Sequence, residues 1–521
     1  MPKIKLKIRE KDLKYYVQSA FSRKITVIFL LVLQVLLFAF LYFYTASGFA
    51  ALYAVQTVLA GVIAVLIVNS NDHPSYKIAW LVPLVVLPGF MSLTYIYLHT
   101  QINRAVFKKR IDNVNRYTSR YIKQDESVLS ELDDEDIYSA RLSKYISEYS
   151  GYPVYKNTDT KYFKVGEELF ESLLEELKKA KNYIFMEYFI IDQGEMWTKI
   201  LEILLVKANS GVDVRLIYDG MGSASILPGG YDKFLNDNGI KCKVFNRFKP
   251  FLTSEQNNRD HRKIAVIDGN TAFTGGINLA DEYINKKERF GHWKDSGIML
   301  KGDAAWSFTM MFFQMWEIDE QTYEDYNRYR PHKIYSACDE CGFVQPYGDC
   351  PNDLEAVGKT VYLDIISKAK DYVYITAPYL VIDNELVTAL AFAAKSGVDV
   401  KIIVPEIYDK WYVHQMSMCY YRELLPCGVK FYSYKPGFVH AKNFVSDDKK
   451  AVVGTINTDF RSLYLHFEDA VFMHDSPAVK DVKKDFLKTL ESCRELTLSD
   501  VNKNIFSRLL GSVIKVFGPL L

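Results

Sequence analysis

Two stretches of the chain carry the same arrangement of side chains suited to nucleophilic and acid–base chemistry. HRKIAVIDGNTAFTGGIN begins at His261, and HAKNFVSDDKKAVVGTIN begins at His440. Both read His-x-Lys, four residues, Asp, six residues, Gly, a small residue, any residue and Asn. Only apolar and turn residues differ between the copies, so the two stretches are predicted to serve one site together.

Two imidazoles, two ammonium groups and two carboxamides suit a phosphodiester, because the reacting phosphorus gathers negative charge on its oxygens. One histidine can attack phosphorus and become a phosphohistidine, while the other protonates the leaving alcohol and deprotonates the incoming one. Lysine and asparagine can hold the non-bridging oxygens. The predicted groups are His261, Lys263, Asn278, His440, Lys442 and Asn457. One copy supplies half of this set, so the site is expected between two halves, and the pattern does not rank the histidines.

Each copy is predicted to form a β-hairpin with a two-residue loop, at Gly269-Asn270 in the first and at Asp448-Lys449 in the second. In that register the histidine faces the asparagine, and the lysine faces the small residue, on one side of the sheet. The residues so gathered are His261, Lys263, Gly276 and Asn278 in one hairpin, and His440, Lys442, Thr455 and Asn457 in the other.

Four acids accompany the motifs. Asp295 in HWKDSG and Glu468 in HFEDAV lie at comparable distances downstream. Each is predicted to accept the second N–H of an imidazole and so fix its tautomer. Asp268 and Asp447 belong to the motifs themselves but fall near the predicted turns. For these two, holding neighbouring loops by hydrogen bonds and direct chemistry both remain open.

The repeat is longer than the motifs. KAKNYIFMEYFIID near Lys179 matches KAKDYVYITAPYLVID near Lys368, and GVDVRLIYDG matches GVDVKIIVPE further along. The order of these pairs is the same in both copies, which indicates two homologous halves. Each half reads as alternating helices and apolar strands followed by the hairpin, a pattern typical of α/β layers around a buried sheet. The predicted halves are 151–330 and 331–500.

The N-terminal region is far more apolar than the rest. Three charge-free runs are each long enough, as helices, to cross the roughly 30 Å of bilayer hydrocarbon. They are 25–44, 49–68 and 79–98. The chain is therefore predicted to be a multi-pass membrane protein. Basic residues flank both ends of this region, so the topology remains open, and Pro83, Pro88 and Gly89 allow a kinked or re-entrant third segment.

The remaining segments are polar or amphipathic. Residues 1–24 are basic, 99–150 form a predicted juxtamembrane connector, and the tail 501–521 alternates apolar and basic residues at helical spacing. Contact of this tail with the membrane surface is slightly favoured over a role as a cap on the second half.

The overall charge argues against a nucleic-acid partner. Lys+Arg number 64 and Asp+Glu 63 in the 521 residues, a net charge of +1. Cys338, Cys341 and Cys350 resemble part of a zinc site with His332 nearby, but a second Cys-x-x-Cys is missing, so unpaired thiols are expected. No metal or cofactor is predicted for catalysis, because the lysines supply the positive charge.

The paired motifs resemble the phospholipase D superfamily, and the flanking text narrows the resemblance to bacterial cardiolipin synthases. The stretches that carry it include RDHRKIAVIDGNTAFTGGINLADEY, TAPYLVID and FVHAKNFVSDDKKAVVGTINTDFRSLYLHFED, and it covers essentially the whole chain. It implies two phospholipase D-like α-β-α halves in one pseudo-twofold α/β unit behind N-terminal transmembrane helices, in the bacterial cell membrane. The implied reaction transfers a phosphatidyl group between two phosphatidylglycerol molecules, with His261 as nucleophile and His440 as acid and base.

Departures from the family pattern are Gly276, where serine is frequent, and His466, where asparagine is frequent. The competing functions are phospholipid hydrolysis, transfer to another alcohol, a nuclease-like phosphodiesterase and a non-catalytic scaffold. The neutral charge and the apolar runs argue against a nuclease. The presence of both histidines and both lysines argues against a decayed site.

Overall fold

A computed structural model describes most of the chain beyond the N-terminus. The described residues are 46–99, 103–223, 226–247, 254–331, 340–351, 355–502 and 505–520, with single positions at 32, 36 and 40. The chain divides into two compact units. One lies within residues 1–107, 248–258 and 513–521, and the other comprises 108–247 and 259–512.

The first unit contains the helices α2 (Ala46–Asn69), α3 (Pro74–Val86) and α4 (Pro88–His99). Within the described residues one segment, Ala50–Asn69, is long and apolar enough to cross a membrane. The predicted run 25–44 lies almost entirely outside the described residues. Many apolar side chains of α2 are exposed, including Val58 at 68%.

The apolar run 79–98 does not form one continuous helix, in line with the kink that Pro83, Pro88 and Gly89 allow. The helix is interrupted at Leu87, whose φ and ψ of −132° and 65° lie outside the α region. Pro88 follows it, and a proline disfavours the helical conformation of the residue before it while lacking the N–H that continues the helix. The result is two short helices, neither of them as long as a membrane span.

The second unit holds two β-sheets, one from each predicted half. The first sheet has seven strands in the order β1-β9-β7-β6-β2-β3-β4. Pairing is parallel between β2, β3 and β4 and antiparallel elsewhere. The strands are β1 (Thr158–Phe163), β2 (Tyr183–Tyr188), β3 (Asp213–Asp219), β4 (Lys241–Phe245), β6 (Lys263–Ile267), β7 (Thr271–Gly275) and β9 (Gly297–Gly302).

The second sheet repeats this order strand for strand as β10-β19-β17-β16-β11-β13-β14, and β20 is added at the end. The predicted duplication is thus a duplication of sheet topology. The strands are β10 (Phe343–Asp349), β11 (Tyr372–Thr376), β13 (Asp399–Pro405), β14 (Lys430–Tyr434), β16 (Asn443–Ser446), β17 (Lys450–Gly454), β19 (His466–His474) and β20 (Cys493–Leu496).

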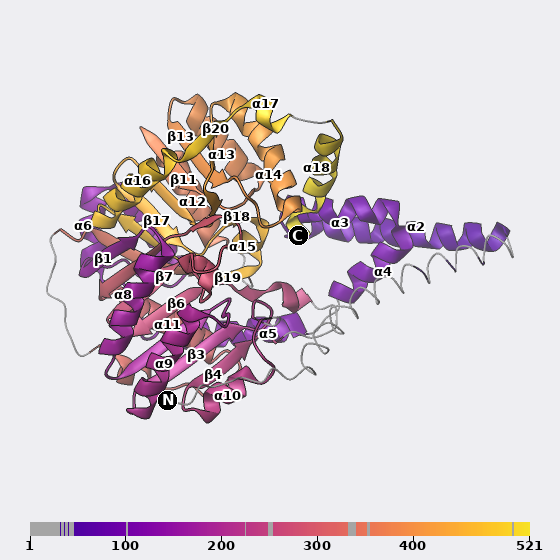
Figure 1. The fold of residues 1–521 in the computed structure, drawn as a ribbon. Helices are drawn as coiled ribbons and strands as arrows, with labels where there is room; N and C mark the ends of the chain where they lie inside the picture. The colour runs from indigo at the N-terminus through magenta and orange to yellow at the C-terminus, as the bar shows by residue number, and fades with distance from the viewer. Residues whose placement is uncertain are drawn as a thin grey trace. The chain divides into compact units, whose positions relative to one another are not determined.

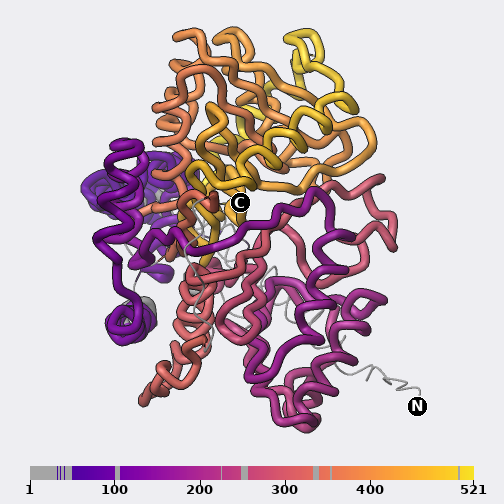
Figure 2. Tube along the Cα trace, turned by 90° about the vertical axis from the view of Figure 1, so that its left-hand side faces the viewer, coloured from indigo at the N-terminus to yellow at the C-terminus, as the bar shows by residue number. Residues whose placement is uncertain are grey.

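Helices cover these sheets, which explains why β2 and β11 are buried along their whole length. Figures 1 and 2 show the two halves side by side, the first in magenta and the second in orange to yellow. Between them, α11 packs against strands of both sheets, and all of its residues except Gln314 are buried. The helices are α8 (Gly166–Lys179), α9 (Glu195–Asn209), α10 (Tyr231–Asp237), α11 (Ala305–Trp316), α12 (Val357–Lys368), α13 (Asn384–Lys395), α14 (Trp411–Leu424), α15 (Phe460–Tyr464) and α16 (Pro477–Leu490).

Further helices lie before and after the two halves. The predicted connector contains three of them, a fourth ends at the first residue of the predicted tail, and a fifth lies within that tail. They are α5 (Asn103–Thr118), α6 (Glu126–Glu135), α7 (Ile137–Tyr149), α17 (Leu498–Val501) and α18 (Ile505–Phe517).

Two short parallel pairings join the halves directly. β5 (Arg259–Asp260) pairs with the start of β19, and β8 (His292–Lys294) pairs with β15 (Gly437–Val439). Each pairing therefore takes one strand from each half. A third short pair, β12 (Leu380–Val381) with β18 (Thr458–Asp459), lies within the second half.

The predicted hairpin register is wrong by one residue in both copies. Ile267 pairs with Thr271, and Ser446 pairs with Lys450, so each loop has three residues. The first loop residue, Asp268 or Asp447, has a positive φ of 51° or 53°. This left-handed conformation, which aspartate tolerates better than most residues, adds the third residue to the loop. The directly facing pairs predicted from the two-residue loop are therefore not formed.

The motif aspartates hold the turns together. The Asp268 carboxylate accepts hydrogen bonds from the backbone N–H groups of Lys181, Asn182 and Tyr183, at 2.7–2.9 Å. Asp447 accepts three equivalent bonds in the second half. Each aspartate also lies seven residues beyond its histidine, roughly 20 Å along an extended chain. The structure therefore does not bring Asp268 and Asp447 to the predicted site.

We expect Asp268→Ala and Asp447→Ala to destabilise the fold by about 1–3 kcal/mol each, because three backbone donors lose their acceptor. The specific activity of the folded fraction should stay close to wild type. Thermal unfolding together with activity per folded molecule measures both effects. Asp448→Ala is the matched control, since the exposed carboxylate of this neighbour contacts the side chains of Lys483 and Tyr372 at the surface. A large loss of activity without loss of stability would assign the motif aspartates to catalysis instead.

The expectation of unpaired thiols is wrong for Cys341, which is disulfide-bonded. Cys338 lies outside the described residues, and Cys350 is not disulfide-bonded. The sequence context of an inter-half connector gave no signal for a disulfide.

Candidate active site

His261 is placed by the pairing of β5 with β19. Its backbone N–H donates to the carbonyl of Phe467 at 2.9 Å, which brings Glu468 beside the imidazole. Nδ1 of His261 lies 2.9 Å from Oε2 of Glu468. Because a carboxylate only accepts, Nδ1 carries the proton and Nε2 keeps its lone pair. An imidazole in this tautomer can act as a nucleophile or as a base.

His440 is placed in the same way by the pairing of β15 with β8. Its backbone N–H donates to the carbonyl of Lys294 at 2.7 Å. Its Nδ1 lies 2.6 Å from Oδ2 of Asp295. Each histidine is therefore oriented by an acid from the other half, and the two dyads are related by the pseudo-twofold repeat.

Lys263 and Lys442 are buried beside the histidines. Each is 1% exposed, and each ammonium donates to the backbone carbonyl of the histidine two residues before it. Residues two apart on a strand share a face, so each lysine lies on the same side as its histidine. The site thus presents two imidazoles and two ammonium groups at one place.

Burial dominates the electrostatics of this group. Desolvation lowers the pKa of Lys442 to about 7 and that of Lys263 to about 8. Desolvation and the neighbouring lysines also lower the pKa of His440 to about 4 and hold the pKa of His261 well below its usual value. Both histidines are therefore neutral at pH 7. Two buried cations crowded together favour an anionic ligand, which would relieve their mutual repulsion.

Asn278 and Asn457 have roles in holding loops. Oδ1 of Asn278 accepts from the backbone N–H of Ile190 at 3.0 Å, and Nδ2 donates to the Tyr283 hydroxyl at 2.7 Å. Nδ2 of Asn457 donates to the Ser462 hydroxyl at 3.1 Å, while its Oδ1 is buried and lacks a partner among the described residues. Among the described residues each Nδ2 has one hydrogen-bond acceptor, so the second hydrogen of each amide could bind a substrate oxygen.

Gly276 and Thr455, which occupy the same motif position, differ in what they do. The Thr455 hydroxyl donates to Oε2 of Glu468 at 2.5 Å and so supports the acid that orients His261. A Cβ on Gly276 would lie 2.0 Å from Oδ1 of Asp295. Glycine is required there because Asp295 occupies the space that a side chain would take.

Two aromatic residues of the site were not predicted. Trp293 and His466 lie two residues before Asp295 and Glu468, and so share their strand face. Their rings lie 5.3 Å from His440 and 5.5 Å from His261, between centroids. Their position in the sequence could have identified them, because each lies two residues before one of the predicted acids. His261, His466 and Glu468 also form a group that could hold a metal ion.

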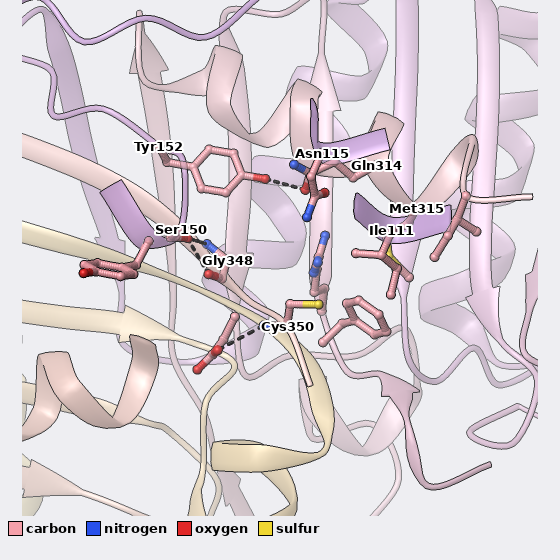
Figure 3. A pocket seen from close by; sticks show the side chains of 13 residues that line it. Ile111, Asn115, Ser150, Tyr152, Gln314, Met315, Gly348 and Cys350 are labelled. Atoms are coloured by element: carbon pink, nitrogen blue, oxygen red, sulfur yellow. Dashed lines mark hydrogen bonds between the residues drawn. The ribbon is translucent and has the colours of Figure 1, made fainter. Parts of the chain in front are cut away.

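A small cavity lies on the other side of these strands. Its lining includes Tyr152, Gln314 and Cys350, which are labelled in Figure 3, and also Arg262 and Phe467. Arg262 and Phe467 adjoin His261 and Glu468 in sequence and therefore point to the opposite face. The volume of about 50 Å³ leaves room for a few water molecules, which is too little for a lipid headgroup.

Comparison with known proteins extends the sequence resemblance. The family model described as "Cardiolipin synthase, PLD-like domain" matches residues 173–301 and 362–490, one match in each half. Cardiolipin synthase 2 of Bacillus anthracis is 32% identical over 89% of this chain and 90% of its own length. Cardiolipin synthase of Halalkalibacterium halodurans is 31% identical over 96% of this chain and 100% of its own length. A Streptococcus mutans serotype c protein, named only as uncharacterized, is 46% identical over 87% of this chain and 98% of its own.

Among solved structures, a phosphatidylserine synthase of Haemophilus influenzae Rd KW20 has the same fold. The TM-score is 0.55 at 14% sequence identity, and the match covers 73% of this chain and all of the other. The similarity is one of fold alone, and it supports the paired α/β architecture.

Proposed function

The chain belongs to the cardiolipin synthase family and is a phosphatidyltransferase of the phospholipase D superfamily, and from this premise we propose that it makes cardiolipin from two phosphatidylglycerol molecules, releasing glycerol. The observation that carries the proposal is the pair of cross-half dyads. Two neutral imidazoles, each held by a carboxylate, lie with two buried ammonium groups at one place. That set provides a nucleophile, an acid and two cations for a phosphodiester.

In the first step Nε2 of His261 attacks the phosphorus of one phosphatidylglycerol. The N–P bond forms as the bond from phosphorus to the glycerol headgroup oxygen breaks, and His440 gives that oxygen a proton. The anionic phosphodiester raises the pKa of His440 from its low value, so that the imidazole takes up the proton it donates. Lys263, Lys442 and the two motif asparagines would hold the non-bridging oxygens.

In the second step His440, now neutral, removes a proton from a headgroup hydroxyl of a second phosphatidylglycerol. The resulting alkoxide attacks phosphorus, the N–P bond breaks, and cardiolipin leaves with His261 restored. Water or another alcohol in place of the second lipid would give hydrolysis or a different phosphatidyl ester. No metal or cofactor enters this scheme, and every step is a substitution at phosphorus.

The substrate is a membrane lipid, so the protein is proposed to act at the bacterial membrane as a multi-pass protein. Its apolar N-terminal helix and α18 support membrane contact. In α18, Ile505, Phe506 and Leu509 are between 62% and 74% exposed, while the same helix carries Arg508 and Lys515. An exposed apolar face beside basic residues is typical of helices that lie on anionic membranes.

The product test is expression in cells that lack cardiolipin, followed by lipid mass spectrometry. We expect cardiolipin to appear with the wild-type chain and to be absent with His261→Ala. Purified protein with labelled phosphatidylglycerol separates the alternatives, because transfer releases glycerol with cardiolipin, whereas hydrolysis releases phosphatidic acid. Phosphatidic acid as the main product would replace the proposed synthase with a hydrolase.

The pH dependence of kcat/KM should follow the protonation state of the two buried lysines. Because both must be protonated to hold the substrate anion, kcat/KM is expected to fall as the pH rises through about 7 to 8, the pKa values of Lys442 and Lys263. A bound phosphodiester raises both values, so the fall in kcat should occur at higher pH. Initial rates in mixed micelles at several pH values measure the profile. A kcat/KM that stays constant across both pKa values contradicts the role of the lysines.

A further inference from the structure

His466 is a buried histidine that the proposed reaction does not use. Its side chain is 11% exposed, and neither ring nitrogen has a hydrogen-bond partner among the described residues. Nδ1 lies 3.6 Å from Oε1 of Glu468, too far for a hydrogen bond, and that oxygen is also buried without a partner in the described part of the chain. Buried polar atoms nearly always have a hydrogen-bond partner, so three buried atoms without a hydrogen bond in one place point to a ligand that these side chains can bind.

His261 completes the group. Its Nδ1 lies 2.9 Å from the other oxygen of Glu468, and its ring centroid is 5.5 Å from that of His466. One donor atom from each of the three side chains lies within 4.8 Å of the others. Two imidazoles and one carboxylate are a donor set that zinc takes in proteins, with a fourth position left for water or another ligand.

We propose that His261, His466 and Glu468 bind a divalent transition-metal ion, Zn²⁺ above all, and that the bound ion reversibly blocks phosphatidyl transfer. Metal binding stands on these three side chains alone, whereas the block rests on the proposed function. An ion on Nε2 of His261 takes the lone pair that attacks phosphorus. An ion on Nδ1 displaces the hydrogen bond to Glu468. In both cases the imidazole of His261 no longer has both a free Nε2 lone pair and an Nδ1–H bonded to Glu468, which the proposed reaction requires.

Among the described residues, the equivalent place beside His440 has no such group. Trp293 takes the place of His466, two residues before Asp295, and its indole N–H donates toward Oδ2 of Asp295 at 3.4 Å. An indole N–H has no lone pair for a metal. The proposed metal site therefore exists only beside His261 among the described residues. It depends on His466, and the equivalent residue beside His440 is Trp293.

The charges around the site make metal and substrate exclude each other. Lys263 and Lys442 oppose a dication, but Glu468 contributes a negative charge, as does Asp469 when it is ionised. A phosphodiester needs the same space beside His261 and the same lysines. Zn²⁺ is thus expected to compete with the lipid and to leave when a chelator is added.

The test uses the full-length protein in detergent micelles after removal of metal by a chelator. Zn²⁺ affinity is measured by competition with a chromophoric chelator, and Co²⁺ absorption reports the ligands. We expect His466→Asn to weaken Zn²⁺ binding at least about tenfold and to remove the histidine-type Co²⁺ spectrum. His292→Asn, which replaces an exposed histidine bonded to Tyr434, is the matched control and should leave both unchanged. Thermal unfolding of both variants verifies the fold, with His466→Gln as the alternative if the asparagine variant unfolds.

Transfer rates are then compared with and without Zn²⁺, each variant against its own metal-free rate. Zn²⁺ should inhibit the wild type, a chelator should restore it, and His466→Asn should be at least about tenfold less sensitive. Equal zinc affinity in the wild type and His466→Asn overturns the proposal. So does binding that is lost without any change in inhibition. Because metal binding is read directly, a protein that binds Zn²⁺ through His466 but makes no cardiolipin would contradict the proposed function and leave the metal site standing.

Discussion

His261→Ala and His440→Ala are each expected to lower kcat for cardiolipin formation by at least ~10³-fold, because each removes the group that attacks phosphorus or the group that transfers the proton. The two variants should fail at different steps. Without His261 no covalent intermediate forms. Without His440 the intermediate can still form from a lipid whose leaving group needs no proton, such as a phenol ester, and it then accumulates because no base activates the acceptor.

Intact-protein mass spectrometry under non-acidic conditions measures this difference, since a phosphohistidine is labile in acid. His440→Ala incubated with the phenol ester should gain the mass of one phosphatidyl group, and His261→Ala should gain none. His292→Ala serves as the control for loss of an unrelated histidine. If His261→Ala carries the added mass and His440→Ala does not, the roles of the two histidines are reversed. If neither single variant loses transfer, the two-histidine mechanism is wrong.

The second large effect concerns Lys442. Burial of its charge lowers the free energy of unfolding, but the same charge is proposed to hold the substrate anion. Lys442→Met keeps a similar volume and removes a buried charge. We expect kcat/KM to fall about 10²–10³-fold because the substrate anion loses a fixed cation. At pH 7 the free energy of unfolding should nevertheless rise by about 1–2 kcal/mol. The gain stays small because the carbonyl of His440 loses its donor and Asp295 loses a neighbouring positive charge.

The pH dependence of that gain has a definite sign. The folded pKa of Lys442, about 7, lies below its ordinary value of 10.5, so protonation of the folded state is disfavoured relative to the unfolded state. The penalty is complete below pH 7, shrinks as the pH rises between the two values and vanishes above 10.5. The difference in Tm between Lys442→Met and the wild type should therefore narrow on raising the pH. The matched control is Lys449→Met, which removes an exposed lysine paired with Asp475 and should change neither activity nor this difference.

Repetition in the sequence predicts which residues belong together in the candidate site. The doubled motif predicted His261, Lys263, His440 and Lys442 as one group, and the structure buries all four around one place. The alternation of helices and apolar strands predicted two α/β halves, and both sheets have the same strand order. These features can be predicted because the same sequence pattern occurs in both halves of the chain.

Other features depended on backbone geometry or on contacts between distant segments. The hairpin loops have three residues because Asp268 and Asp447 adopt a positive φ, which residue type permits but does not require. The choice of Glu468 for His261 and Asp295 for His440 follows from strand pairing across the halves. Spacing alone is equally consistent with each histidine using the acid that follows it in its own half.

The exchange of acids between the halves has a consequence for synthesis of the chain. Glu468 follows His261 by 207 positions, so a ribosome that has finished the first half has made this imidazole but not the carboxylate that orients it. An unfinished or truncated polypeptide that ends before residue 468 therefore holds an imidazole without the carboxylate that fixes its tautomer. Under the proposed mechanism, phosphodiester cleavage is therefore expected only after translation has passed residue 468.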